Sequence, residues 1–269
     1  MLFSLCLCLY VWHHETVYAA ERQKTILTAA RSQGRVEVSS LADELNVTAE
    51  TIRRDLTVLE RRGLLTRMHG GAIPADALTP EPALDERIGH RAAEKQRVAL
   101  RALEEIPDGG SILLDAGTST LAIAHAIPDE LPLTVVANSP MICAVLASKP
   151  GITLLQLGGR VRARTGAAVG HWTTEALADL TIDVGFIGTN GFDAVRGLTT
   201  PDESEAATKR AMVDACRTTV LVADSSKASQ VHLHRFADLA DVDLVITDTD
   251  LDESTAESLR DAGPDIVTV

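Results

Sequence analysis

The chain of 269 residues contains few aromatic side chains and few cysteines. Phe, Trp and Tyr together make up 3% of the residues, which argues against a surface that binds single-stranded nucleic acid by stacking bases on aromatic rings. The four cysteines include no pair that combines metal-ligand spacing with histidine partners, so no metal site and no cofactor are predicted. Cys143 and Cys216 stand singly among apolar residues, which is typical of small buried side chains in a reducing cytoplasm.

Positive charge is scarce and unevenly distributed. The formal net charge is −13, which is unfavourable for a partner made of nucleic acid. Residues 17–73, however, hold nine Lys and Arg against seven Asp and Glu, whereas residues 74–269 hold sixteen against thirty. A nucleic acid partner should therefore bind the N-terminal part and be repelled by the rest.

Three short helical segments are expected in the N-terminal part. Residues 21–32 place apolar side chains at helical spacing. Ser39 or Ser40 can cap a second helix, and Thr48 can cap a third. Asn46, which tolerates a left-handed backbone, can make the tight turn between them.

The third helix has an apolar and a polar side. Ile52, Leu56 and Leu59 follow one another at i, i+4 and i+7 and form the side that faces the core. Arg53 and Arg54 lie beside or opposite it, and the planar donors of arginine match phosphate oxygens or the edge of guanine. The alternative is a solvated surface on which the arginines only pair with neighbouring acids: Glu50, Asp55 and Glu60.

A β-hairpin is expected directly after this helix. Residues 64–68 form the first strand, His69-Gly70-Gly71 the turn, and residues 72–73 the return strand. Helix, turn, basic helix and hairpin in this order form a winged helix-turn-helix, whose basic helix enters the major groove of DNA. This order is more specific than two adjacent arginines, and it favours DNA binding over the solvated surface. The candidate DNA contacts are Ser39, Thr48, Thr51, Arg53, Arg54, Arg67 and His69.

The remainder of the chain alternates between strands and helices. A linker rich in Pro and Ala is expected at its start, within residues 74–90. Apolar strands are expected at 111–114, 134–137, 152–157, 184–187, 219–223 and 244–247. Helices are expected at 87–106, 119–126, 141–147, 172–180 and 203–217. Continuous apolar strands between helices indicate a mainly parallel, Rossmann-like α/β sheet covered on both faces.

Ligands of such sheets bind beyond the carboxyl ends of the strands, and five of these ends are polar or rich in glycine. Residues 115–120 follow the first strand and open a helix, where backbone amides and hydroxyls favour an anion such as phosphate. The candidate ligand-binding residues are Asp115, Gly117, Thr118, Ser119, Thr120, Asn138, Gly158, Gly159, Arg160, Gly188, Glu205, Lys209 and Lys227. Each has a structural alternative, such as a turn or, for Glu205 and Lys209, a salt bridge within one helix. Arg160, Arg162 and Arg164 alternate like the exposed side of a strand.

Both parts of the chain resemble the DeoR family of bacterial transcription regulators. In the N-terminal part the resemblance rests on Thr51 to Leu56 and on His69-Gly70-Gly71-Ala72. In the second part it spans residues 83–249 and rests on strand ends such as Asp115 to Thr120 and Asp224 to Lys227. It implies a winged helix-turn-helix domain (residues 17–73), a linker (74–90), and a sensor and oligomerisation domain (91–269) related to sugar-phosphate isomerases.

The resemblance also implies a function. The expected protein is a cytoplasmic, nucleoid-associated repressor of a carbohydrate-utilisation operon, a homo-oligomer (dimer or tetramer) without a membrane segment. Its partners would be double-stranded operator DNA and a phosphorylated sugar or polyol. The alternative is a sugar-phosphate isomerase or deaminase that carries a DNA-binding module, with Glu205 as the base and Lys209 as the charge stabiliser.

The first sixteen residues differ from the rest of the N-terminal part, because they contain neither Lys nor Arg. Met1 to Trp12 is nearly all apolar, but it lacks a basic start and is too short to span a bilayer. The resemblance begins at about Tyr18, and Val17 stands where an initiator is expected, because GTG codons can start bacterial genes. We therefore expect residues 1–16 to reflect a misassigned start site, with a membrane anchor as the alternative. N-terminal mass spectrometry of the natural protein decides between them, since a peptide from residues 9–16 excludes the misassignment.

Overall fold

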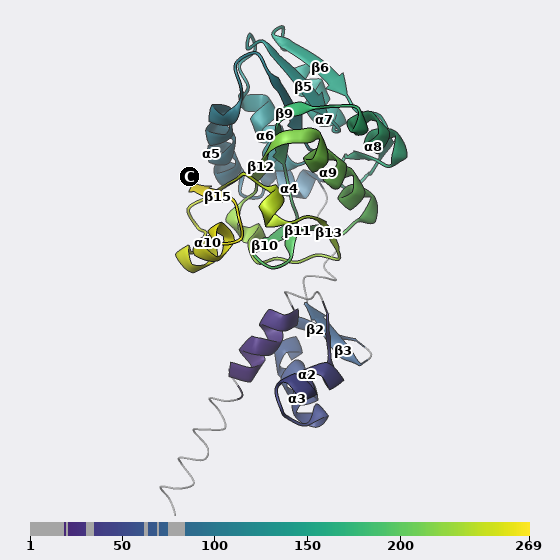
Figure 1. Cartoon of the computed structure of the whole chain (residues 1–269), viewed down its shortest axis with the longest axis vertical. Coiled ribbons are helices and arrows are strands. Elements are labelled where there is room, and N and C mark those ends of the chain that lie inside the picture. The colour runs from purple at the N-terminus through teal and green to yellow at the C-terminus, as the bar shows by residue number, and fades with distance from the viewer. Residues whose placement is uncertain (1–18, 20, 31–34, 62–63, 69, 75–83) are drawn as a thin grey trace, which may run out of the picture. The chain divides into compact units, whose positions relative to one another are not determined.

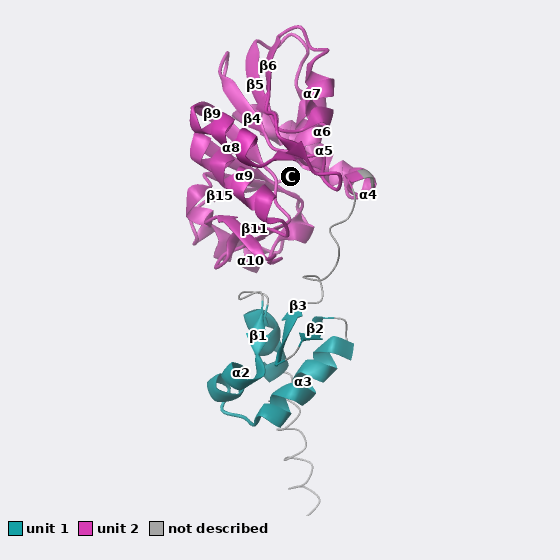
Figure 2. Ribbon diagram, turned by 90° about the vertical axis from the view of Figure 1, so that its right-hand side faces the viewer, with its two compact units in different colours: residues 1–80 teal, residues 81–269 magenta. Residues whose placement is uncertain are grey.

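The computed structural model describes residues 19, 21–30, 35–61, 64–68, 70–74 and 84–269 (Figure 1). The chain divides into two compact units, residues 1–80 and residues 81–269 (Figure 2). We call them the N-terminal unit and the C-terminal unit and describe each by itself.

The N-terminal unit is a winged helix-turn-helix, as predicted. Residues 21–30 are helical, and the helices α2 (Val38–Glu44) and α3 (Ala49–Arg61) follow. The strands β1 (Val36–Glu37), β2 (Leu65–Met68) and β3 (Gly71–Pro74) pair antiparallel in the order β1-β3-β2. Ile52, Leu56 and Leu59 of α3 are buried in the core, as their spacing predicts. Asn46 takes the left-handed conformation with φ of 51°.

The start of α2 differs from the prediction. The helix begins at Val38, so its first turn contains both Ser39 and Ser40, and neither serine is its cap. Glu37 stands at the cap position without a side-chain hydrogen bond. The Val38 amide instead donates to the Gly70 carbonyl at 2.9 Å. The β2–β3 hairpin, which is the wing, thus satisfies one of the free amides at the helix start. The cap of α3 is as predicted, because the Thr51 amide donates to Thr48 Oγ1 at 3.2 Å.

The C-terminal unit contains a parallel sheet of seven strands in the order β15-β14-β12-β9-β4-β5-β6. The strands are β4 (Ser111–Leu114), β5 (Leu133–Ala137), β6 (Ile152–Gln156), β9 (Ile182–Ile187), β12 (Cys216–Val222), β14 (Leu244–Thr247) and β15 (Asp265–Thr268). The predicted α/β fold is confirmed, although β15 was not foreseen.

Helices cover both faces of this sheet. Apolar residues of α5 (Ala92–Ala102), α6 (Thr118–Ala126) and α7 (Pro140–Leu146) pack on one face. Those of α8 (His171–Ala178), α9 (Glu203–Ala215) and α10 (Glu253–Arg260) pack on the other. Two small antiparallel sheets complete the unit. One contains β10 (Gly191–Asp193), β11 (Gly197–Thr200) and β13 (His234–Ala237), and the other is the hairpin of β7 (Arg160–Val161) and β8 (Ala168–Val169).

The strand order places a topological switch point between β4 and β9. From β4 the chain proceeds outward through β5 and β6, then returns to add β9 on the other side of β4. Ligand crevices of open α/β sheets form where the order reverses in this way, beyond the carboxyl ends of the two strands. Asp115 follows β4 and Gly188 follows β9, so two predicted ligand-binding residues lie at this point.

The predicted helix at 87–106 is wrong in its continuity. The structure contains α4 (Leu84–Gly89), a break at Arg91, then α5 and a 3-10 turn, η2 (Leu103–Glu105). Arg91 has a left-handed backbone with φ of 52°, and its guanidinium pairs with Asp248 at 3.3 Å and with Asp250. These distant carboxylates hold Arg91 in a conformation that local helical propensity disfavours. Helix α4 also lies within residues 74–90, the segment expected as a linker.

Candidate functional site

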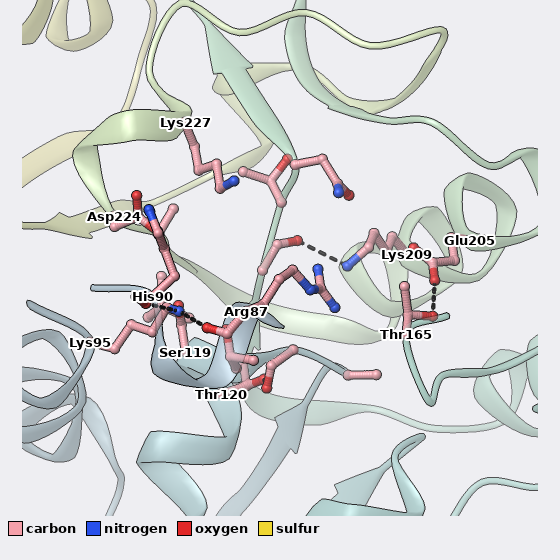
Figure 3. A pocket seen from close by; sticks show the side chains of 18 of the residues that line it. Arg87, His90, Lys95, Ser119, Thr120, Thr165, Glu205, Lys209, Asp224 and Lys227 are labelled. Carbon is pink, nitrogen blue, oxygen red and sulfur yellow. Dashed lines mark hydrogen bonds between the residues drawn. The ribbon is translucent and has the colours of Figure 1, made fainter. Parts of the chain in front are cut away.

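A cavity of about 250 Å³ lies at the switch point of the C-terminal unit (Figure 3). Its floor is made by residues that follow β4, β9 and β12, and its walls come from α4, α5, α9 and the loop of the β7–β8 hairpin. Eight of the predicted ligand-binding residues line it: Gly117, Thr118, Ser119, Thr120, Gly188, Glu205, Lys209 and Lys227.

The start of α6 forms one wall of the cavity. Gly117 stands at the cap position with an extended backbone, and a Cβ there would meet Thr120 Oγ1 at 3.3 Å. The first amides of a helix have no partner within the helix, and together with the helix dipole they favour a bound anion. The Thr120 hydroxyl donates to the Asp115 carbonyl and so fixes the loop. Thr118 and Ser119 of the same turn also line the cavity.

A buried ion pair lies at the base of the cavity. The Lys209 ammonium donates to the Asp115 carboxylate and, at 3.0 Å, to the Gly188 carbonyl. The Gly188 amide donates to the same Asp115 oxygen at 3.0 Å. Burial raises the pKa of the Asp115 carboxyl, and the Lys209 ammonium opposes that rise. This pair joins β4, β9 and α9 at the switch point.

The structural alternative for Glu205 and Lys209, a salt bridge between them within α9, is not formed. Glu205 accepts hydrogen bonds from Arg162, from Thr165 and, at 3.4 Å, from Thr200, while Lys209 pairs with Asp115. Both side chains are nearly buried, so partners from other elements replace the pairing that their spacing suggests. The expected alternation of exposed arginines also fails, because Arg162 turns inward to Glu205 and Asp202.

Three cationic side chains reach the cavity besides Lys209. Arg87 of α4 extends into its middle, and Lys227 approaches from the opposite side (Figure 3). The Lys95 ammonium donates to the carbonyl oxygens of Arg87 and His90, and burial lowers its pKa. Glu86 and Asp224 contribute carboxylates to the same lining. The mixture of cations, amides and hydroxyls is suited to a small ligand with one anionic group.

Five predicted ligand-binding residues lie outside the lining. Asp115 is buried beneath it. Asn138 holds the hairpin, since its side-chain amide donates to the Ala168 carbonyl at 3.1 Å. Gly158 and Gly159 pack against Thr173, and Arg160 donates to Ser204 at 3.2 Å. These last four follow β5 and β6, which lie on the far side of β4 from the switch point.

The prediction missed other lining residues. Thr189 and Asn190 follow β9 and Asp224 follows β12, so they belong to polar strand ends and their position in the sequence could have identified them. Five more lie on elements that were expected to be a linker, a plain helix or an exposed strand: Glu86, Arg87, His90, Lys95 and Thr165. Ala116, Val222 and Ala223 complete the lining.

The two cysteines among the described residues carry no sign of reactivity. Cys143 is buried and Cys216 is partly buried. Burial raises the pKa of both thiols, that of Cys216 to about 12. Since the thiolate is the nucleophile and the metal ligand, both cysteines serve as packing residues.

The candidate DNA-binding surface lies on α3. The side chains of Arg53 and Arg54 are 53% and 79% exposed, and each guanidinium lies 3.6 Å from the Glu50 carboxylate. The arginines therefore do pair with a neighbouring acid, as the solvated-surface alternative expects. Exposed pairs of this kind contribute less than about 1 kcal/mol to stability, so they leave the guanidinium groups available to DNA. Asp55 is not available to these arginines, because it is buried and accepts hydrogen bonds from Arg22 and Gln23.

The wing lies beside the same face of α3. The Arg67 guanidinium donates to the Thr57 hydroxyl at 3.3 Å, and the Arg67 amide donates to Glu60 at 3.1 Å. Thr48 and Thr51 share a hydrogen bond of 2.9 Å between their hydroxyls at the start of α3. Ser39 is exposed on α2, and His69 lies outside the described residues. The individual DNA contacts stay predictions.

The described residues contain neither a candidate membrane span nor a candidate metal site. None of their helices is long and apolar enough to cross a membrane. In that same part of the chain, no group of three or more His, Cys, Asp or Glu side chains is placed to hold a metal ion.

Comparison with known proteins gave matches for both units. Residues 22–77 match the family described as the DeoR-like helix-turn-helix domain, and residues 90–249 match the DeoR C terminal sensor domain. The HTH-type transcriptional regulator GlpR of Haloferax volcanii is 38% identical over 248 residues, which cover 92% of this chain and 97% of that protein. The glycerol-3-phosphate regulon repressor of Escherichia coli K12 is 32% identical over 241 residues, with coverage of 90% and 95%. Among solved structures, ribose 5-phosphate isomerase A of Methanocaldococcus jannaschii aligns with 50% of this chain and 53% of its own, at 16% identity and a TM-score of 0.37.

Proposed function

The chain belongs to the DeoR family of transcriptional regulators, and on that premise we propose that it represses a carbohydrate-utilisation operon and leaves its operator when a phosphorylated sugar or polyol fills the cavity. The relatives are named as regulators, one of them as a repressor of a glycerol-3-phosphate regulon. The DNA would be double-stranded and bound through α3 and the wing. A dimer or larger homo-oligomer would present two such modules to two half-sites, in the cytoplasm where the nucleoid lies.

The observation that carries this proposal is the pairing of a helix start with cations around one cavity. The amides at the start of α6 would receive the phosphate, since a helix N-terminus favours a negative charge. Lys227 would contribute a cation from the opposite wall. Thr165, Thr189 and Asn190 would meet the hydroxyl groups of the carbon chain. About 250 Å³ lies just below the range of drug-sized pockets, about 300–1,000 Å³, so a small sugar phosphate is favoured over a nucleotide.

The enzyme alternative receives less support from the same geometry. Glu205, the candidate base, is held by the Arg162 guanidinium and by two threonine hydroxyls. These donors occupy both carboxylate oxygens. A substrate would have to displace one of them before Glu205 could accept its proton, since a general base must lie within hydrogen-bond reach of that proton.

Phosphorylated ligands are expected to raise the melting temperature of the protein. A ligand present at 100 times its Kd adds about 2.7 kcal/mol to the free energy of unfolding. Thermal-shift measurements with glycerol 3-phosphate, pentose phosphates and hexose phosphates would test this, and the unphosphorylated glycerol and sugars serve as matched controls. The proposal requires a rise with at least one phosphate and none with its control. Equal shifts for both members of a pair, or no shift with any phosphate, would count against it.

A further inference from the structure

Helix α4 belongs to neither matched family region, yet it builds part of the cavity. The matched regions end at residue 77 and begin at residue 90, and α4 occupies Leu84–Gly89 between them. Glu86 and Arg87 of this helix line the cavity, as does His90 directly after it. Figure 3 shows the Arg87 side chain extending into the space between Lys209 and Ser119. The segment that leads from the N-terminal unit therefore places a guanidinium where the proposed ligand would bind.

Polar contacts at its two ends hold this short helix. At its start, the Leu84 amide donates to the Arg164 carbonyl at 3.1 Å. At its end, Lys95 donates to the carbonyl oxygens of Arg87 and His90. Ile88, one residue before the end of α4, is 40% exposed, so the helix buries little apolar surface at that position. An element held in this way moves when its few polar contacts are exchanged for others.

Lys95 is the contact best placed for such an exchange. Its side chain lines the cavity and is nearly buried, and an ammonium has three protons to donate. Two of them are directed to the carbonyl oxygens at the end of α4. A phosphate is a stronger acceptor for a buried ammonium than a carbonyl oxygen, because a charge-assisted hydrogen bond is roughly twice as strong as a neutral one.

Arg91 connects the end of α4 to the opposite wall. Its guanidinium pairs with Asp248 at 3.3 Å. The Asp248 carboxylate accepts hydrogen bonds from the amide and hydroxyl of Ser225 at 2.8 and 2.7 Å. Ser225 opens the 3-10 turn η3 (Ser225–Lys227), and Lys227 of this turn lines the cavity. A ligand that contacts Lys227 is therefore connected, through η3, Asp248 and Arg91, to the backbone break after α4.

We propose that Arg87 and Lys95 bind the anionic group of the effector, and that Lys95 exchanges the carbonyl oxygens of α4 for it. The proposal rests on the function proposed above, because it assumes a phosphate in the cavity. Arg87 would grip the anion with its planar fork of donors, for which lysine is a poor substitute. Occupancy of the cavity would then alter how α4 is held, and α4 begins four residues after the boundary of the N-terminal unit. The effector acts on the equilibrium only through such a difference between the two conformations.

The test uses the full chain with inorganic phosphate and glycerol 3-phosphate as probes, followed by isothermal titration calorimetry. Arg87→Gln is expected to weaken binding roughly tenfold or more, the size of one charge-assisted hydrogen bond. Arg87→Lys should recover only part of the loss, since it restores the charge without the fork. Arg97→Gln removes the same charge from an exposed position on α5 and should leave the affinity unchanged.

A second measurement separates ligand binding from its effect on α4. Hydrogen exchange of the amides of residues 84–91 should change when the wild-type protein is saturated with phosphate. In Lys95→Met this response should be lost even at concentrations that saturate the variant. The inference is overturned if Arg87→Gln binds phosphate as tightly as the wild type does, or if phosphate leaves the exchange rates of α4 in the wild type unchanged. Either result leaves the proposed function standing. Absence of phosphate binding by the wild type overturns both.

Discussion

Replacement of Lys209 by methionine is expected to destabilise the C-terminal unit by about 3–5 kcal/mol. Asp115 is 1% exposed and Lys209 is 5% exposed, so the change leaves a buried carboxylate without its cation. The Gly188 amide alone would remain as a donor to that oxygen. Domains of this size are stable by only about 5–15 kcal/mol, so the variant would lose a large part of its free energy of unfolding. Urea unfolding followed by circular dichroism measures this loss.

Two further variants act as controls for this prediction. Asp115→Asn combined with Lys209→Met removes both charges and should recover much of the lost stability, because the penalty comes from the unpaired charge. Arg260→Met breaks a pair whose two partners, Arg260 and Glu253, are 42% and 74% exposed, and that carboxylate can return to water at a cost below about 1 kcal/mol. A loss of less than about 1 kcal/mol in Lys209→Met itself, the range of exposed pairs, would contradict the structural role given to this pair.

The same variant should show a characteristic pH dependence. Burial raises the pKa of the Asp115 carboxyl, and Lys209 is the main group that opposes this rise. Without Lys209 the neutral acid is the favoured form in the fold, so its stability is present at low pH and is lost as the pH rises through the folded pKa. The difference from the wild type should therefore shrink as the pH is lowered toward 3.8, the ordinary aspartate value.

Arg54→Ala is expected to weaken operator binding by about 1–3 kcal/mol if this guanidinium contacts a base. Its side chain is 79% exposed at the start of α3, and its neighbour Glu50 holds it only through an exposed pair at 3.6 Å. A DNA phosphate or a guanine edge can displace that carboxylate at little cost. Binding to a duplex selected from a random library, followed by gel shift at fixed salt, would provide the measurement.

Control variants distinguish base recognition from general attraction. Arg260→Ala removes an exposed arginine from the C-terminal unit and should not change DNA binding. Glu50→Ala removes the acid that neighbours both Arg53 and Arg54, and it should strengthen binding slightly. A base contact lowers affinity for the selected duplex alone, whereas a phosphate contact lowers it for all duplexes and reduces the salt dependence. If Arg54→Ala gives the same gel-shift curve as the wild type with the selected duplex and with a duplex of unrelated sequence, Arg54 is excluded from the interface.

The sequence predicted most of the elements because their signals are local. Ile52, Leu56 and Leu59 lie on one side of a helix by spacing alone, and the apolar strands β4, β5 and β9 show their burial in consecutive residues. The loop after β4 was predictable because a glycine and several hydroxyl residues stand between a strand and a helix. These features depend on residues a few positions apart, which a pattern can detect.

The contacts that complete the site depend on residues far apart in the chain. Lys209 pairs with Asp115, 94 positions away, and Arg162 reaches Glu205 across 43 positions. Helical spacing suggested a pair of Glu205 with Lys209 that is not formed. The spacing takes no account of Asp115, which follows strand β4 and pairs with Lys209. The break at Arg91 was missed for the same reason, since carboxylates 157 and 159 positions away hold it. Arg87 was consequently read as part of a plain helix.

The most direct test of the central claim is release of DNA by the ligand. Fluorescence anisotropy of a labelled operator duplex would be followed while a sugar phosphate that raises the melting temperature is titrated into the complex. We expect the ligand to weaken DNA binding by about 5–150-fold, the usual range of coupling between two sites, and its unphosphorylated form to have no effect. DNA affinity that stays unchanged at saturating ligand would contradict it.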